Sequence, residues 1–178
     1  MHKSRRLFGA LTLIGAIALA LAPASPAKGP AGGFDREYLT DMIGHHTMAV
    51  EMGEMAVDKA THPQLKQAAE TIIKTQSAEI KQMRAWLRKW YGKHHVSTEH
   101  GHEDMAAMEE LEEASGAEFE IRFLALMSVH HVQAVERSEA ALDRARHPQV
   151  RKLAKAIIKA QNREIKQFRN WLVDWYAG

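Results

Sequence analysis

Apolar residues recur every three or four positions in four long stretches of the chain. Two of these stretches, at about 34–59 and 63–91, follow each other after a short break. Two more of the same kind run at about 117–144 and 148–176. This spacing matches the 3.6-residue turn of an α-helix, and no stretch alternates at period two with β-branched residues. The sequence therefore predicts an all-α protein with four long helices.

The breaks between the stretches predict that the helices pair into hairpins. A His-Pro dipeptide stands at each break, at 62–63 and 147–148, where proline is tolerated in the first turn of a helix. Asp35 or a neighbour is expected to cap the first helix, and Ser115 with Glu118 fits a capping box before the third. Two hairpins that each carry one apolar face would cover it by packing into a four-helix bundle.

The two halves of the chain are copies of each other. A shift of 85 residues aligns 34–91 with 119–176 without a gap, and 29 of the 58 aligned pairs are identical, which indicates an internal duplication. Two copies are too few for a solenoid, so we expect a closed two-fold arrangement. The repeats are placed at 34–92 and 117–178, with a linker at 93–116 between them.

Residues 1–24 have the composition of an export signal. Lys3, Arg5 and Arg6 precede an apolar run at 7–21, and A-P-A at 22–24 fits a cleavage site. The run is shorter than the ~20 residues that a membrane span needs, although a retained anchor is the alternative. We therefore expect a periplasmic or secreted protein, exported by the Sec or the twin-arginine route, with no stable membrane span after leader removal.

The charge of the mature chain argues against a nucleic-acid partner. The full chain has 24 Lys and Arg against 22 Asp and Glu, but three of the basic residues lie in the leader. The mature chain is thus close to neutral and offers no basic surplus to attract phosphates. It also has no cysteine, so any metal site must use His, Met, Asp or Glu.

The first long helix contains M-I-G-H-H-T-M-A-V-E-M at 42–52, which brings imidazoles and thioethers together. At about 100° per residue, His45, Met48 and Met52 share one edge of the helix, while His46 points into the apolar face or toward the other repeat. Imidazole with thioether favours copper, above all Cu(I), or Ag(I), whereas Mg²⁺ and Ca²⁺ prefer oxygen. The candidate ligands of this stretch are Met42, His45, His46, Met48 and Met52.

The second repeat keeps only part of this stretch. Met127, His130 and His131 remain as candidate ligands, but Gln133 and Arg137 replace the edge thioethers. Such replacements would be costly in a core, so we expect this edge to be exposed or in a wet groove, and the second site to be weaker or structural. The competing interpretation is that methionine fills the core and each histidine is a hydrogen-bonded core residue.

The linker is a second candidate region for metal binding. It combines histidine with methionine and acidic residues, and 104–113 is predicted to form a short acidic helix. Such tracts bind divalent ions, here Cu(II) or Zn(II), at modest affinity. The candidate ligands of the linker are His94, His95, His100 and His102.

Three motifs of the first repeat follow one another in a specific order. M-x-x-H-H-x-x-A-x-x-M at 42–52 precedes the His-Pro turn and Q-x-x-E-I-x-x-M at 76–83. The combination resembles the domain-of-unknown-function 305 family, also called CopM-like, in two tandem copies. The resemblance implies a ferritin-like four-helix bundle, secreted or periplasmic, with members that bind copper and support copper tolerance. It also implies Met83 as a ligand, whereas the second repeat departs at Arg137 and Phe168.

Together these features predict an exported protein that sequesters copper, or hands it to a metal-handling partner in the cell envelope, and that is not an enzyme. One alternative is a metal-free interaction protein that uses the tryptophan-rich ends of the bundle. Another is a carboxylate-bridged di-iron oxidase, which needs Glu-x-x-His in two bundle helices. The sequence has one such motif, from Glu99 to His102, and it lies in the linker.

Overall fold

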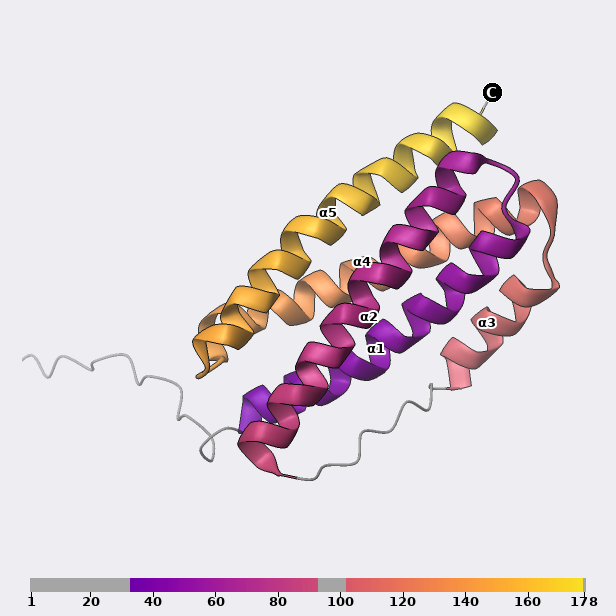
Figure 1. Ribbon diagram of the computed structural model, residues 1–178. Helices are drawn as coiled ribbons and strands as arrows, with labels where there is room; N and C mark the ends of the chain where they lie inside the picture. Colours follow the sequence, from indigo (N-terminus) through magenta and orange to yellow (C-terminus); the bar gives the residue numbers. More distant parts are fainter. Residues whose placement is uncertain (1–32, 93–101, 178) are drawn as a thin grey trace, which may run out of the picture.

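The computed structural model describes residues 33–92 and 102–177, and these form five α-helices (Figure 1). The first hairpin consists of α1 (Gly33–Lys59) and α2 (Pro63–Tyr91), and the second of α4 (Gly116–Arg144) and α5 (Pro148–Tyr176). The shorter α3 (His102–Glu113) precedes the second hairpin.

The predicted all-α fold is confirmed, and each helix begins and ends within two residues of its predicted bounds. None of the helices in this part of the chain is long and apolar enough to cross a membrane. The predicted leader and His94, His95 and His100 lie outside the described residues, whereas His102 is the first residue of α3.

The two hairpins pack against each other mainly through their first helices, α1 and α4. Apolar side chains form one core near each end of the structure. The α3-side core includes Phe119, Phe123 and Phe168, and the opposite core includes Ile43 and Ile157. Burying each such side chain stabilises the fold by about 1.5–3 kcal/mol. The pairing of helices into hairpins is thus confirmed, while the ferritin-like architecture stays a prediction.

A buried carboxylate of α1 holds the turn of the other hairpin. Asp35 accepts hydrogen bonds from the backbone N–H groups of Arg146 and His147, each at 2.8 Å, and lies 2.5 Å from His147 Nδ1. Asp35 therefore does not cap α1, and the alternative that a neighbouring residue caps this helix stays a prediction. Asp35 is the third residue of α1, and its partners are the donors of the α4–α5 turn, which only the folded structure brings near.

Glu120 of α4 makes the equivalent contact at the other end. Its carboxylate accepts hydrogen bonds from the backbone N–H groups of Thr61, at 2.5 Å, and His62, at 2.8 Å. The carboxylate also lies 2.6 Å from His62 Nδ1, and the hydroxyl of Tyr176 donates to it. Each hairpin therefore supplies the acid that satisfies the turn of the other, as a closed two-fold pairing requires.

Tryptophan rings cover both turns. The ring centroid of Trp175 lies 3.9 Å from that of His62, and the centroid of Trp90 lies 3.8 Å from that of His147. Both histidines occupy N-cap positions, but neither side chain makes a capping hydrogen bond. Their rings instead join the two hairpins, which gives both histidines and both tryptophans a structural role.

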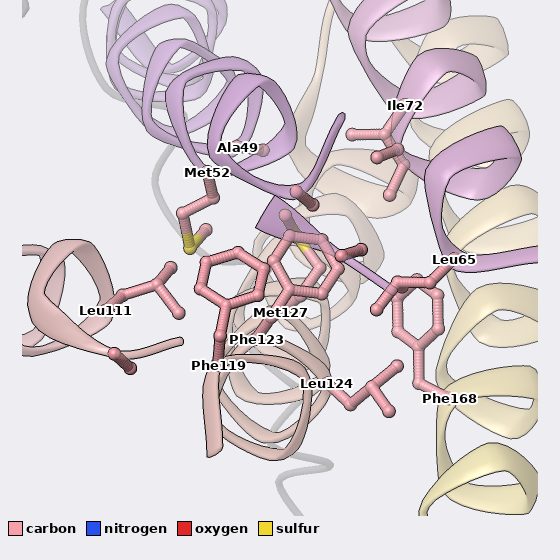
Figure 2. Close-up of a cluster of buried hydrophobic side chains, with 14 of the residues drawn as sticks. Ala49, Met52, Leu65, Ile72, Leu111, Phe119, Phe123, Leu124, Met127 and Phe168 are labelled. Carbon is pink, nitrogen blue, oxygen red and sulfur yellow. The ribbon is translucent and has the colours of Figure 1, made fainter. Parts of the chain in front are cut away.

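The helix α3 packs mainly against α4 and also contacts the end of α1. Leu111 is buried in the α3-side core, where Figure 2 shows it pointing toward Met52 and Phe119. Arg122 of α4 pairs with Glu110 of α3 at 2.7 Å. Lys59 of α1 donates a hydrogen bond to the backbone carbonyl of Glu112. Contacts from both neighbouring helices therefore fix α3 in place.

The predicted capping box at the start of α4 does not form. Ser115 does occupy the N-cap position, but its side chain makes no capping hydrogen bond. Glu118 pairs instead with Arg122, one turn further along the helix, at 3.0 Å. This i,i+4 ion pair competes for the carboxylate that would have closed the box.

Candidate metal centre

Two histidine rings stack on each other where α1 packs against α4. The ring centroids of His45 and His130 are 3.6 Å apart, with an interplanar angle of 29°. These are equivalent residues of the two repeats, so their contact lies on the approximate two-fold axis. All four ring nitrogens are buried and make no hydrogen bond of good geometry, although the side chain of Gln133 lies near His45 and the backbone of His45 lies near His130. A buried polar group without a hydrogen bond costs about 1–3 kcal/mol of stability. The pair therefore destabilises the protein unless a ligand binds to its nitrogens.

The surroundings of the stacked rings keep them neutral. Burial, followed by the positive charge of Arg137, lowers the pKa of His45 to about 3. Burial also lowers the pKa of His130 well below its usual value, and the neighbouring His45 lowers it further. A neutral imidazole keeps one nitrogen lone pair, which is the form that binds a metal.

A second pair of histidines flanks the stack, and glutamates hold it. His46 Nε2 lies 2.9 Å from Glu79 Oε2, and His131 Nε2 lies 2.7 Å from Glu164 Oε2. Both imidazoles are completely buried, so the prediction that His46 points into the protein is confirmed. A carboxylate on one ring nitrogen orients the ring, and Nδ1 of His46 has no partner.

The methionine edge of the first repeat is buried, which corrects the expectation of an exposed edge. Met48 is 5% exposed and Met52 is 0% exposed. Both belong to the α3-side core, and Figure 2 shows Met52 beside Leu111. In the second repeat, Gln133 and Arg137 are exposed, as expected. Leu111 of α3 contributes to this difference, because it packs in the same core as Met48 and Met52. The comparison of the two sequences therefore predicted one edge correctly and the other wrongly.

The remaining candidate methionines divide between the two cores. Met127 lies in the α3-side core, together with Met48 and Met52. Met42 of α1 and Met83 of α2 lie in the opposite core. The side chains of Met127, Met42 and Met83 are completely buried. Within residues 33–92 and 102–177, no three His, Asp or Glu side chains are close enough together to hold one metal ion. Imidazole and carboxylate alone therefore do not form a ready site in this part of the chain.

Sequence reasoning missed Gln76 and Gln161, which occupy equivalent positions in α2 and α5. Each is 3% exposed, and Oε1 of each has no hydrogen-bond partner. The two amides line a groove of about 320 Å³, together with Glu79 and Glu164. The amides could have been found from the sequence, because both repeats keep this polar residue on the apolar face of its helix, one turn after Ile72 and Ile157.

Comparison with known families gives one match that spans both hairpins. The sequence profile of DUF305, a domain of unknown function, matches residues 35–172. Because this is a single match, the presence of two tandem copies of the family stays a prediction.

Solved structures of CopM are similar to this chain over nearly their whole length. The Cu(I)-bound form is 34% identical with a TM-score of 0.72, and the match covers 80% of this chain and 97% of that one. The Cu(II)-bound form is 35% identical with a TM-score of 0.73, and an Ag-bound form is 34% identical with a TM-score of 0.71. Both matches cover the same shares of the two chains. The similarity to a protein solved with these ions suggests a metal-binding protein.

Two further relatives add less about function. A DUF305 protein from Streptomyces coelicolor is 24% identical with a TM-score of 0.71, and the match covers 82% of this chain and 95% of that one, which shows the shared fold. The uncharacterized protein L153 of Acanthamoeba polyphaga mimivirus is 42% identical over 53 residues. That match spans 30% of this chain and only 35% of the viral protein.

Proposed function

The chain belongs to the DUF305 family, and on this premise we propose that it binds copper, above all as Cu(I), in the cell envelope. The observation that carries the proposal is the stack of His45 on His130, whose buried ring nitrogens make no hydrogen bond of good geometry. The protein would sequester the ion or pass it to a metal-handling partner, and so support copper tolerance. We propose binding and transport of the ion, with no catalysis.

The available donors favour a soft monovalent ion. Imidazole nitrogen combined with thioether sulfur selects Cu(I) or Ag(I) over hard cations. His45 and His130 would supply nitrogen, and Met48 and Met52, on the same edge of α1 as His45, would supply sulfur. Thioethers carry no proton, and the lowered pKa keeps His45 neutral, so binding at this edge would release few protons.

A second group of the same donor types lies on the other side of the axis. His46, Met42 and Met83 come from α1 and α2, and all are buried. Its counterpart in the second repeat has Phe168 in place of Met83 and so lacks one thioether. The linker histidines would add weaker binding of Cu(II) or Zn(II), because imidazole without fixed geometry suits borderline divalent ions.

Competition against a Cu(I) chelator tests the stacked pair directly. We expect the double substitution His45→Ala with His130→Ala to raise the Kd for Cu(I) about 100-fold or more, because it removes both nitrogen ligands. Met48→Leu with Met52→Leu keeps the side-chain volume and removes only sulfur, and we expect about a tenfold rise. Met105→Leu is the matched control, since Met105 is 56% exposed on α3. Wild-type affinity in the double histidine variant would refute the assignment.

A further inference from the structure

Equivalent polar residues of both repeats line the groove between α2 and α5. Its lining includes two equivalent pairs, Gln76 with Gln161 and Glu79 with Glu164. The groove has a volume of about 320 Å³. At ~30 Å³ per water molecule, this space holds roughly ten waters, which is enough for a cation with part of its hydration shell.

The two glutamines that line the groove each have a buried side-chain oxygen without a partner. Both side chains are 3% exposed, and Oε1 of each is buried without a hydrogen bond. An amide oxygen only accepts hydrogen bonds, so its missing partner is a donor or a cation. Both repeats keep this glutamine, although they differ at the methionine edge.

The two glutamates are held in position from behind. Oε2 of Glu79 contacts His46, and Oε2 of Glu164 contacts His131, which leaves the second oxygen of each carboxylate outside these contacts. The glutamate side chains are 25% and 26% exposed, so they lie between the interior and the open groove. A hydrogen bond from His46 orients Glu79, whereas His131 and Glu164 are within ion-pair distance without a hydrogen bond of good geometry.

This set of donors suits a different ion from the one that the methionine edge would take. Carboxylate and carbonyl oxygens are the ligands that Mg²⁺, Mn²⁺ and Ca²⁺ prefer, and two carboxylates balance a divalent charge. Lys159 and Arg163 also line the groove, but both are exposed, so water and salt screen their charge. Because no three His, Asp or Glu side chains of the described residues reach one ion, the cation would keep several of its waters.

We propose that the groove between α2 and α5 binds a partly hydrated hard divalent cation through Gln76, Glu79, Gln161 and Glu164. This site is distinct from the stacked pair of His45 and His130, although its two glutamates also contact His46 and His131. It joins the two hairpins along their second helices, whereas the direct packing between the hairpins is mainly through α1 and α4.

Titration of the mature chain with Mn²⁺, followed by the electron paramagnetic resonance signal of the free ion, tests the proposal. We expect Glu79→Gln with Glu164→Gln to raise the Kd for Mn²⁺ at least tenfold, and Gln76→Leu with Gln161→Leu to raise it severalfold. The matched control is Glu54→Gln with Glu139→Gln, which makes the same charge change at equivalent exposed positions. The control variant should bind Mn²⁺ within twofold of wild type.

The position of the ion is tested without any substitution. Bound Mn²⁺ should broaden the backbone amide signals of groove residues, such as Thr75 and Ala160, more than those at either end of the bundle. An unchanged free-Mn²⁺ signal with wild-type chain, or broadening away from the groove, would overturn the proposal. Cu(I) binding measured on the same samples separates the two sites, because failure of Mn²⁺ binding with intact Cu(I) binding refutes the groove alone.

Discussion

The hydroxyl groups of Tyr38 and Ser138 share a buried hydrogen bond of 2.9 Å that joins α1 to α4. The duplication puts Phe123 and Gly53 at the equivalent positions, so the symmetry-related contact between α4 and α1 lacks both hydroxyls together. This fits the energetics, since losing one partner leaves a buried polar group unpaired and losing both does not. At Gly53 a Cβ atom would come within 2.9 Å of Ile73 Cγ1, so the serine of the other repeat would not fit there.

We expect substitutions of this hydroxyl pair to be strongly non-additive. Tyr38→Phe and Ser138→Ala should each lower the free energy of unfolding by about 1–3 kcal/mol, because each leaves the other hydroxyl buried alone. The double variant should lose about 1 kcal/mol less than the sum of the two. Urea denaturation at pH 7 measures all three, with exposed Ser77→Ala as a control expected within about 0.5 kcal/mol of wild type. Simple addition of the two losses would contradict the pairing.

Among the elements, α3 decides which methionines water can reach. Its apolar contact with the bundle centres on Leu111, which packs in the same core as Met48 and Met52. The ion pair of Arg122 with Glu110 is exposed and contributes little on its own. The part that α3 adds to the cover over the methionine edge therefore comes from Leu111, with Met108 packed beside the same core.

Leu111→Ala should uncover this edge. We expect peroxide to oxidise Met48 and Met52 several times faster in the variant, because exposure controls the conversion of a thioether to its sulfoxide. The variant should also lose about 2 kcal/mol or more of stability, as a buried leucine does on truncation. Peptide mass spectrometry at timed intervals measures oxidation at each methionine. Met105 is the internal reference, since it is exposed already, and equal rates at Met52 in the two proteins would show that α3 does not protect it.

The helices and hairpins could be predicted from the sequence because their signals are local. Apolar spacing and the two His-Pro turns fix the bounds of α1, α2, α4 and α5 within a residue or two. The burial of Met52 could not be predicted, since it depends on where an acidic helix of weak periodicity packs. The role of Asp35 was missed for the same reason, because its hydrogen-bond partners are 111 and 112 residues away along the chain.

The candidate site was predicted in part. The helical angle correctly separated His45 from His46, but the contact of His45 with His130 depends on how the two repeats meet. The groove could not be predicted from the sequence, because Gln76 and Gln161 line the same space only when both hairpins are in place. Spacing along a helix gives the direction of a side chain, and the packing of distant segments decides what that side chain meets.

At the scale of the whole molecule, buried acids hold the two hairpins together at both ends. Burial alone raises the pKa of Glu120, but hydrogen bonds from Tyr176, His62 and Thr61 outweigh burial and lower the pKa to about 2. The folded protein therefore stabilises the charged form of this carboxylate more than the unfolded chain does. A lowered pKa means that this stabilisation is complete above the ordinary value of 4.5 and is lost as pH falls through about 2.

We expect the wild-type protein to lose stability steeply between pH 4.5 and pH 2. Glu120→Gln should cost about 2 kcal/mol at pH 7, since it removes charge-assisted hydrogen bonds, and its stability should change less across that acid window. Urea denaturation at a series of pH values measures both effects. Glu118→Gln, at an exposed carboxylate of the same helix, should follow the wild-type profile. A Glu120→Gln profile parallel to wild type would mean that this carboxylate does not link the hairpins.

A single segment such as α3 cannot cover two symmetric edges at once. Two separate copies of one hairpin would show identical faces to their surroundings, and every mutation would appear on both. Fusion into one chain removes that constraint, so Met48 can stay sealed in a dry, sulfur-lined edge while Gln133 and Arg137 lie open to water. The two equivalent edges of the molecule therefore differ in chemistry, so a partner that binds one edge would not bind the other in the same way.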